Sequence, residues 1–218
     1  MKVAILGWGS LIWDLQSKHQ WFQDTIDVWQ AEGPTLPIEF CRISSSRERA
    51  LTLVLQPTPI GSPCRVSFAV SKRGDLADVI ADIAKREDCG VAKIGCCLAA
   101  EPANATGQYP NLCATIQRWL DNIEPKLDAV VWTDLENNFE ERSDRMKPFS
   151  VGEALIHLKR LPPGGRSKAA EYVWRAPDFV QTKLRRKIET WPCVVPTKPG
   201  KRKDSIKRPH AKTTPWAQ

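Results

Sequence analysis

The chain lacks a long apolar run, and this absence excludes a membrane-spanning helix of ordinary length. A helix that crosses a bilayer needs ~20 predominantly apolar residues, and no stretch of the 218 residues approaches that length. The apolar residues 3–6 are followed by Gly7 and Gly9, and no small-residue cleavage site comes after them. We therefore expect residues 3–6 to be the first strand of the mature protein and not part of a signal peptide.

The sequence also lacks the residue spacings that are typical of metal sites, disulfide frameworks and dinucleotide sites. Its seven cysteines include no CxxC pair, and its three histidines are not spaced as metal ligands. A dinucleotide fingerprint needs a third glycine three residues after Gly9, where this chain has Ile12. An odd number of cysteines is typical of free thiols in a reducing compartment. We predict a cytoplasmic protein without a bound metal.

Positive charge is concentrated near the C-terminus. Residues 182–218 hold eleven of the 32 Lys and Arg and two of the 25 Asp and Glu, so they carry +9 and the remaining residues −2. We expect residues 191–218 to be a basic, proline-rich, disordered tail, dispensable for fold and chemistry from Pro196 onward. Nucleic-acid binding through this tail is a weaker alternative, because Trp191 and Trp216 are its only aromatic residues.

Apolar alternation predicts mainly strands in the first 70 residues and a mixture of helices and strands afterwards. The expected strands are residues 3–6, 36–43, 50–55, 64–70, 91–99 and 128–133. The expected helices are residues 75–87, 111–123, 151–161, 169–175 and 182–189, with an irregular segment or short helix at 20–30. Because strands and helices do not alternate regularly, residues 1–190 are expected to form an α+β domain. Its sheet is largely antiparallel or mixed, and a small closed barrel with flanking helices is one arrangement of it.

The first strand runs into a loop that contains two glycines, and this loop is the most informative feature of the sequence. Gly7 and Gly9 can adopt positive φ, which allows neighbouring backbone N–H groups to point at one spot. Such a group of donors suits a carboxylate or a phosphate. The alternative is an ordinary turn after a first strand.

The stretch from Leu6 to Trp13 resembles the YGSL-type signature of the γ-glutamylcyclotransferase-like family. Gly9, Ser10 and Leu11 match the signature, and Trp8 stands where the family has tyrosine, so it offers an indole N–H in place of a hydroxyl. The elements that follow, as far as Thr133, also come in the family's order. The resemblance implies a small mixed barrel with flanking helices. It also implies a substrate-binding role for the loop, whose residues are Gly7, Trp8, Gly9, Ser10 and Leu11.

The same resemblance implies that Glu87 is the catalytic carboxylate. Arg86-Glu87 matches the Arg-Glu pair often seen in that family, at the end of the helix that begins at Asp75. We therefore expect Glu87 to face the loop of residues 7–11 across a pocket. The alternative is a solvated, charged helix end. The other candidate carboxylates are expected to be structural or solvated; they are Asp88, Glu39, Glu48 and Glu101. Three further polar residues are expected to have surface or strand roles, with polar contacts to the substrate as the alternative; they are Arg42, Ser44 and Arg65.

The family's reaction explains why one carboxyl group suffices. The α-amino group of a γ-glutamyl peptide or amine attacks its own γ-carbonyl, which releases 5-oxoproline and a free amine. The nucleophile belongs to the substrate, so the resemblance implies no enzyme nucleophile, no metal and no organic cofactor. The predicted protein is thus a lyase or acyltransferase acting on a small γ-glutamyl substrate, with no membrane partner. The alternative is a non-catalytic ligand-binding or regulatory module of the same fold.

Overall fold

The computed structural model describes residues 1–14 and 19–190, and in these residues seven strands form two sheets. The larger sheet has the order β5-β1-β7-β6, in which β1 and β7 are parallel and the other pairs are antiparallel. The smaller sheet, β3-β2-β4, is antiparallel. The strands are β1 Val3–Gly7, β2 Thr35–Ile43, β3 Leu51–Leu55, β4 Ser62–Arg65, β5 Ser67–Val70, β6 Ile94–Leu98 and β7 Ala129–Thr133.

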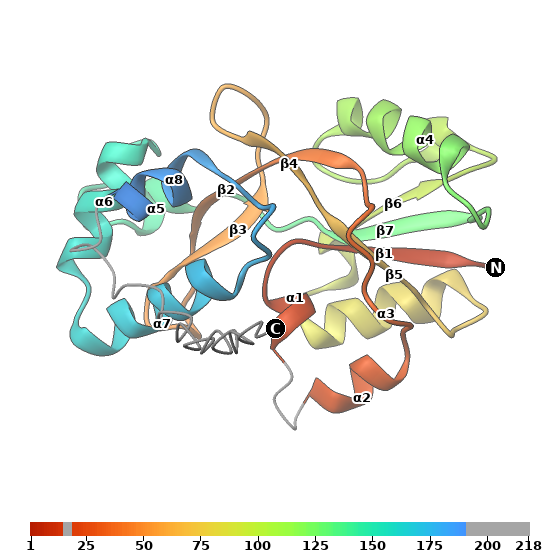
Figure 1. Ribbon diagram of the computed structural model, residues 1–218, viewed down its shortest axis with the longest axis horizontal. Coiled ribbons are helices and arrows are strands. Elements are labelled where there is room, and N and C mark those ends of the chain that lie inside the picture. Colours follow the sequence, from red (N-terminus) through yellow and green to blue (C-terminus); the bar gives the residue numbers. More distant parts are fainter. Residues whose placement is uncertain (15–18, 191–218) are drawn as a thin grey trace, which may run out of the picture.

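Helices cover both faces of the larger sheet and gather beside the smaller one. Figure 1 shows α3 and α2 on one face of the larger sheet and α4 on the other, with α5 to α8 at the far end of the molecule. The helices are α1 Ser10–Trp13, α2 Gln20–Asp24, α3 Leu76–Arg86, α4 Cys113–Asn122, α5 Phe139–Arg142, α6 Val151–Arg160, α7 Pro163–Arg175 and α8 Lys183–Thr190. Short 3₁₀ turns lie at Val91–Lys93, Pro102–Asn104 and Pro110–Leu112.

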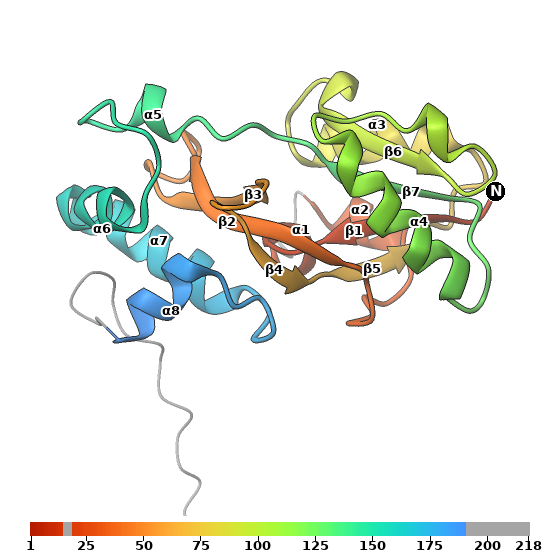
Figure 2. The same cartoon turned by 90° about the horizontal axis from the view of Figure 1, so that it is seen from above.

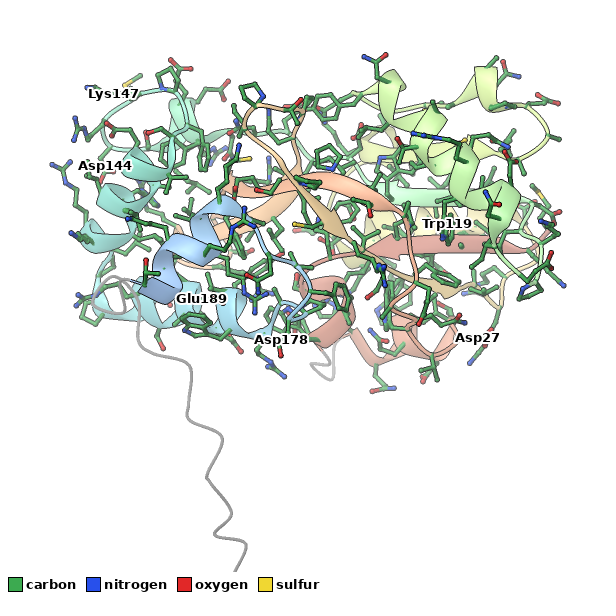
Figure 3. The ribbon with its side chains drawn as sticks, turned by 45° about the horizontal axis from the view of Figure 1, so that its top comes forward. Asp27, Trp119, Asp144, Lys147, Asp178 and Glu189 are labelled. Carbon is green, nitrogen blue, oxygen red and sulfur yellow. The ribbon has the colours of Figure 1, made fainter. Side chains whose placement is uncertain are left out.

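Alternation along β1 explains why the protein has two apolar cores. Val3 and Ile5 point to the face covered by α3, whereas Ala4 and Leu6 point to the core that α4 shares with the smaller sheet. Figure 2 shows β2 crossing the middle of the molecule, between the larger sheet and the end that holds α5 to α8. In Figure 3, Trp119 of α4 lies toward one end of the molecule, and Asp144, which follows α5 in the sequence, lies at the other end. Because all four of these β1 side chains are buried, the strand is fixed on both faces.

The prediction of an α+β fold with a mixed sheet is confirmed, but a closed barrel is not found in the described residues. The expected strand 64–70 is two strands, because the chain leaves one sheet and enters the other at Val66. β4 pairs with β2, and β5 pairs with β1. Val66 is buried between them and its N–H donates to Pro34 O at 3.0 Å. The strands therefore form two open sheets and not one continuous cylinder.

Two other predicted elements have different boundaries. The expected strand 91–99 begins at Ile94, because residues 91–93 form a 3₁₀ turn. The expected helix 169–175 begins six residues earlier, at Pro163. A Cβ at Gly165 would lie 2.7 Å from the carbonyl oxygen of Glu48, so the α7 backbone approaches the β2–β3 turn too closely for a larger residue. Gly165 weakens the helical pattern of the sequence, but the tertiary packing of α7 requires a glycine there.

No helix in the described part of the chain is long and apolar enough to cross a membrane. The six cysteines there are free thiols. The predicted tail, residues 191–218, lies outside the described residues.

Glu39 has a structural position, as expected for this carboxylate. It is fully buried in β2 and its carboxyl oxygens accept hydrogen bonds from Phe40 N at 2.9 Å and Lys183 N at 3.0 Å. Lys183 is the first residue of α8, so the carboxyl group lies where a helix has unpaired N–H donors. Burial raises the pKa of Glu39. The side chain joins α8 to the smaller sheet.

We expect Glu39→Ala to destabilise the fold by about 2 kcal/mol, because the buried Phe40 N–H and Ser62 hydroxyl lose their acceptor and the Lys183 N–H keeps only Ser62 Oγ. For a protein of this size such a loss lowers Tm by about 4–8 °C. Thermal unfolding followed by circular dichroism measures the effect. Glu101→Ala is the matched control, because Glu101 is exposed and its carboxyl group accepts a hydrogen bond from the nearby Asn104 side chain. An unchanged Tm for Glu39→Ala would show that Glu39 does not hold α8 in place.

Candidate functional site

A cavity of about 390 Å³ brings the predicted loop and the predicted carboxylate together. One wall is the end of β1 and the start of α1, which contribute Gly7 to Leu11. The end of α3 contributes Arg86 and Glu87 to the same cavity. The β2–β3 hairpin, α5 and α7 complete the lining. Elements that are distant in the sequence thus place Glu87 and the loop around one space.

The two loop glycines do not adopt positive φ, so the expected conformational reason for them is wrong. Gly9 has φ −135°, and in the described residues Gly107 is the only glycine with positive φ. Both loop glycines are needed for close approach instead. A Cβ at Gly9 would lie 2.2 Å from Tyr172 Oη, and one at Gly7 would lie 2.7 Å from the ring of Trp29. The backbone can follow its path only because these side chains are missing.

Trp8 fixes the loop to the smaller sheet. Its side chain is buried in the larger core, and its indole Nε1–H donates to Leu53 O of β3 at 3.3 Å. The indole donor therefore already has a protein partner. Trp8 lines the cavity, but its side chain serves packing.

Tyr172 of α7 is a site residue that the sequence analysis missed. Its hydroxyl oxygen accepts a hydrogen bond from Ser10 N at 3.4 Å, and the residue lines the cavity. Burial raises the pKa of the Tyr172 phenol, and the nearby Glu87 carboxyl group raises it further. No sequence signal marked this residue, because it lies 162 positions from Ser10 in a segment that showed only helical periodicity. Tyr172 places a phenol hydroxyl beside the loop, where Trp8 cannot supply one.

Glu87 occupies the C-terminal end of α3, where the helix stops. Its N–H donates to Ile83 O at 2.9 Å, and the next residue, Asp88, has φ +51°. α3 begins at the predicted cap, because the Asp75 carboxylate accepts from Ala77 N and Asp78 N. Helical spacing buries Val79, Ile83 and Ala84 against the larger sheet and leaves the Glu87 side chain 18% exposed toward the cavity. Helix length and register therefore determine where this carboxyl group lies.

Arg86 and Arg47 hold the walls of the site in place. The Arg86 side chain is 4% exposed and its Nη2 donates to Ser10 O at 3.1 Å and to Asp14 O at 3.4 Å. Arg47 Nη2 lies 2.8 Å from Asp14 Oδ2, and its guanidinium group stacks 5.2 Å from the centre of the Tyr172 ring. These contacts join the end of α3, the short helix α1 and the hairpin turn. The site is built by charge-assisted hydrogen bonds between its own walls.

The surroundings of Glu87 favour its neutral form more than usual. Burial raises the pKa of Glu87, the charges of Arg86 and Arg47 lower it in part, and Asp14 raises it again. The Arg86 Nη1 to Glu87 Oε1 distance of 3.5 Å is long for an ion pair. A carboxyl group whose pKa is moved toward neutrality can both accept and return a proton. This is the property that general acid–base chemistry requires.

The remaining polar residues that the sequence offered as site candidates lie in two different places. Asp88, Arg42 and Ser44 line the cavity, whereas Arg65 lines a different surface groove beside Trp119.

In residues 1–14 and 19–190 no three His, Cys, Asp or Glu side chains are placed to hold a metal ion. No protein-family model, curated protein or solved structure matches the chain. A functional proposal therefore depends on the motif and on the geometry of this cavity.

Proposed function

We propose that the protein is a γ-glutamylcyclotransferase-like enzyme that cleaves a γ-glutamyl peptide or amine and releases 5-oxoproline. The observation that carries the proposal is that Glu87 and the loop of residues 7–11 line one cavity. The two open sheets would be an opened variant of that family's barrel. The six free cysteines of the described residues suit an enzyme of the reducing cytoplasm.

In the proposed reaction Glu87 moves a proton while the substrate supplies the nucleophile. The Glu87 carboxylate takes a proton from the substrate's α-ammonium group, and the freed amine attacks the γ-carbonyl carbon. The attacking nitrogen loses its second proton to water from the tetrahedral intermediate. The amide C–N bond then breaks, and Glu87 returns the proton to the leaving amine. Holding the glutamyl chain folded, so that nitrogen meets carbonyl, is an orientation effect worth several kcal/mol.

The loop is proposed to bind the α-carboxylate or to polarise the γ-carbonyl oxygen. The first N–H groups of a helix have no partner within that helix, and α1 begins in the cavity wall at Ser10. Donors aimed at a developing oxyanion stabilise it in the transition state. The Ser10 N to Tyr172 Oη bond is long at 3.4 Å, so a substrate oxygen can compete for the same N–H. Tyr172 would then contact the substrate through its hydroxyl group.

Product analysis tests this function directly. The purified full-length chain is incubated with γ-glutamyl-alanine, glutathione and γ-glutamyl-ethylamide, and 5-oxoproline and free amine are quantified. The proposal expects both products in equal amounts from at least one substrate. Binding of these compounds without turnover would favour the non-catalytic module instead.

The pH dependence of kcat/KM gives a separate prediction, because only the carboxylate form of Glu87 accepts a proton. The acidic limb of the profile should lie above the ordinary glutamate pKa of 4.5, since burial raises the pKa of Glu87. Arg47→Gln removes a charge that favours the carboxylate, so the limb should move to higher pH. Asp14→Asn removes a charge that opposes it, so the limb should move to lower pH.

The pair of variants provides its own control, since each removes one partner of the same 2.8 Å ion pair. General damage to the walls would change both profiles in the same way. Shifts in one direction for both variants would contradict the role of Glu87 as the titrating base.

A further inference from the structure

One part of the cavity has no role in the proton transfer described above. Three cationic side chains line it, namely Arg42 at the end of β2, Arg142 at the end of α5 and Lys168 on α7. Arg42 is half-buried, whereas Arg142 and Lys168 are exposed. Figure 1 shows that the elements carrying them belong to the helical end of the molecule and to the smaller sheet. They line the same cavity as Glu87 and the loop of residues 7–11.

The backbone places Arg42 and Arg142 near each other, and the charge of Arg142 acts on Arg42. The β2–β3 register shifts between Phe40 and Arg42, and a bulge of this kind redirects the side chains that follow it. Beyond the bulge, Arg42 Nη1 donates to Glu136 O at 2.8 Å, which ties β2 to the segment before α5. Arg49 Nη2 donates to Arg142 O at 3.0 Å and holds the end of α5 beside the hairpin turn.

The three cations are not held by ion pairs within the described residues. The other two arginines of the cavity have anionic partners, Asp14 for Arg47 and Glu87 for Arg86. By contrast, no described carboxylate forms an ion pair with Arg42, Arg142 or Lys168. Burial lowers the pKa of Arg42 and the neighbouring Arg142 lowers it further, against the opposing effect of Glu136. Like charges held together in this way would be stabilised by an anion.

The hairpin turn adds neutral donors to the same place. Ser44, Ser45 and Ser46 line the cavity between Arg42 and Arg47, and Ser44 Oγ and Ser46 Oγ are 3.2 Å apart. Hydroxyl and guanidinium groups together suit the oxygens of a carboxylate or a phosphate. These hydroxyl groups and the three cations line the same cavity as Glu87.

We propose that Arg42, Arg142 and Lys168 form a subsite for a carboxylate or phosphate group on the leaving amine of the substrate. The assignment to the leaving amine rests on the proposed function, because the loop of residues 7–11 is taken up by the glutamyl part. The binding of an anion at these three residues does not rest on it. The preferred substrates are then γ-glutamyl compounds whose released amine is anionic.

Matched pairs of substrates test the specificity. γ-Glutamyl-glycine is compared with γ-glutamyl-glycinamide, and γ-glutamyl-phosphoethanolamine with γ-glutamyl-ethanolamine. In the variant Arg142→Gln/Lys168→Gln the ratio of kcat/KM for the anionic over the neutral partner should fall at least about tenfold, the size expected for lost charge-assisted hydrogen bonds. The pair with the larger fall identifies the group as carboxylate or phosphate. The control variant Arg118→Gln/Lys126→Gln removes two cations outside the cavity lining and should keep the wild-type ratio.

A binding measurement separates failure of this subsite from failure of the proposed reaction. Inorganic phosphate and succinate are titrated calorimetrically into the full-length chain and both double variants, which all retain the basic tail. Weaker binding in Arg142→Gln/Lys168→Gln alone, without any 5-oxoproline release by the wild type, would support the subsite and overturn the reaction. Turnover with an unchanged anionic-to-neutral ratio would support the reaction and overturn the subsite. Unchanged anion binding together with absent turnover would overturn both.

Discussion

Glu87→Gln is expected to reduce 5-oxoproline release by at least about a hundredfold, the usual lower size of a general acid–base contribution. The amide keeps the shape of the side chain but cannot take a proton from the substrate ammonium group. The fold should persist, because the carboxyl group has no close ion pair, the nearest cationic atom being Arg86 Nη1 at 3.5 Å. Initial rates with the best γ-glutamyl substrate, together with near-UV circular dichroism, measure both effects.

Asp88→Asn is the matched control for this variant. Asp88 is the next residue and lines the same cavity, but it is exposed. The control removes one negative charge at nearly the same place, so a general electrostatic effect would appear in both variants. Turnover of Glu87→Gln close to that of the wild type would exclude Glu87 as the base.

Gly9→Ala should have the second-largest effect, through the backbone of the loop. The added Cβ would lie 2.2 Å from Tyr172 Oη, so either α1 or α7 must move. Overpacking of this kind costs about 1–3 kcal/mol, and a displaced loop also loses its alignment with Glu87. We expect kcat/KM to fall at least about tenfold, since small misplacements of binding groups have such effects.

Two further variants show whether the Tyr172 contact is the cause. Tyr172→Phe removes the closest atom and leaves ring carbon Cζ at 3.0 Å, so Gly9→Ala should destabilise less in that background than in the wild type. Gly152→Ala in α6 is the control, because its Cβ would meet only Ser150 Oγ at 3.8 Å and should not lower Tm. Equal costs of Gly9→Ala in both backgrounds would contradict the proposed contact.

Local patterns predicted the elements around the site well. The helix begins at Asp75 as expected, and apolar spacing predicted that it stops near Glu87, the residue that follows α3. The two strands that pair as the β2–β3 hairpin were also predicted, because alternation is a local signal. These elements carry Glu87 and much of the hairpin wall of the cavity.

Features that depend on distant contacts were not predicted. The break at Val66 divides an apolar run whose alternation reads as one strand, and only the pairing of β4 and β5 with different sheets reveals it. Tyr172 reaches the loop from α7 because Gly9 leaves space for its hydroxyl, a relation with no local signature. The loop glycines were likewise expected to adopt positive φ, because their contacts with Tyr172 and Trp29 have no local signature either. Those close contacts are the reason that glycine is required at both positions.

The most direct test of the central claim follows oxygen from water during turnover. The wild-type chain is incubated with its best γ-glutamyl substrate in H₂¹⁸O, and the products are analysed by mass spectrometry. Attack by the substrate's own amine predicts unlabelled 5-oxoproline in equal amount to the released amine, and strongly reduced formation with Glu87→Gln. Glutamate carrying ¹⁸O in its γ-carboxyl group would show that water is the nucleophile and would contradict the proposed mechanism.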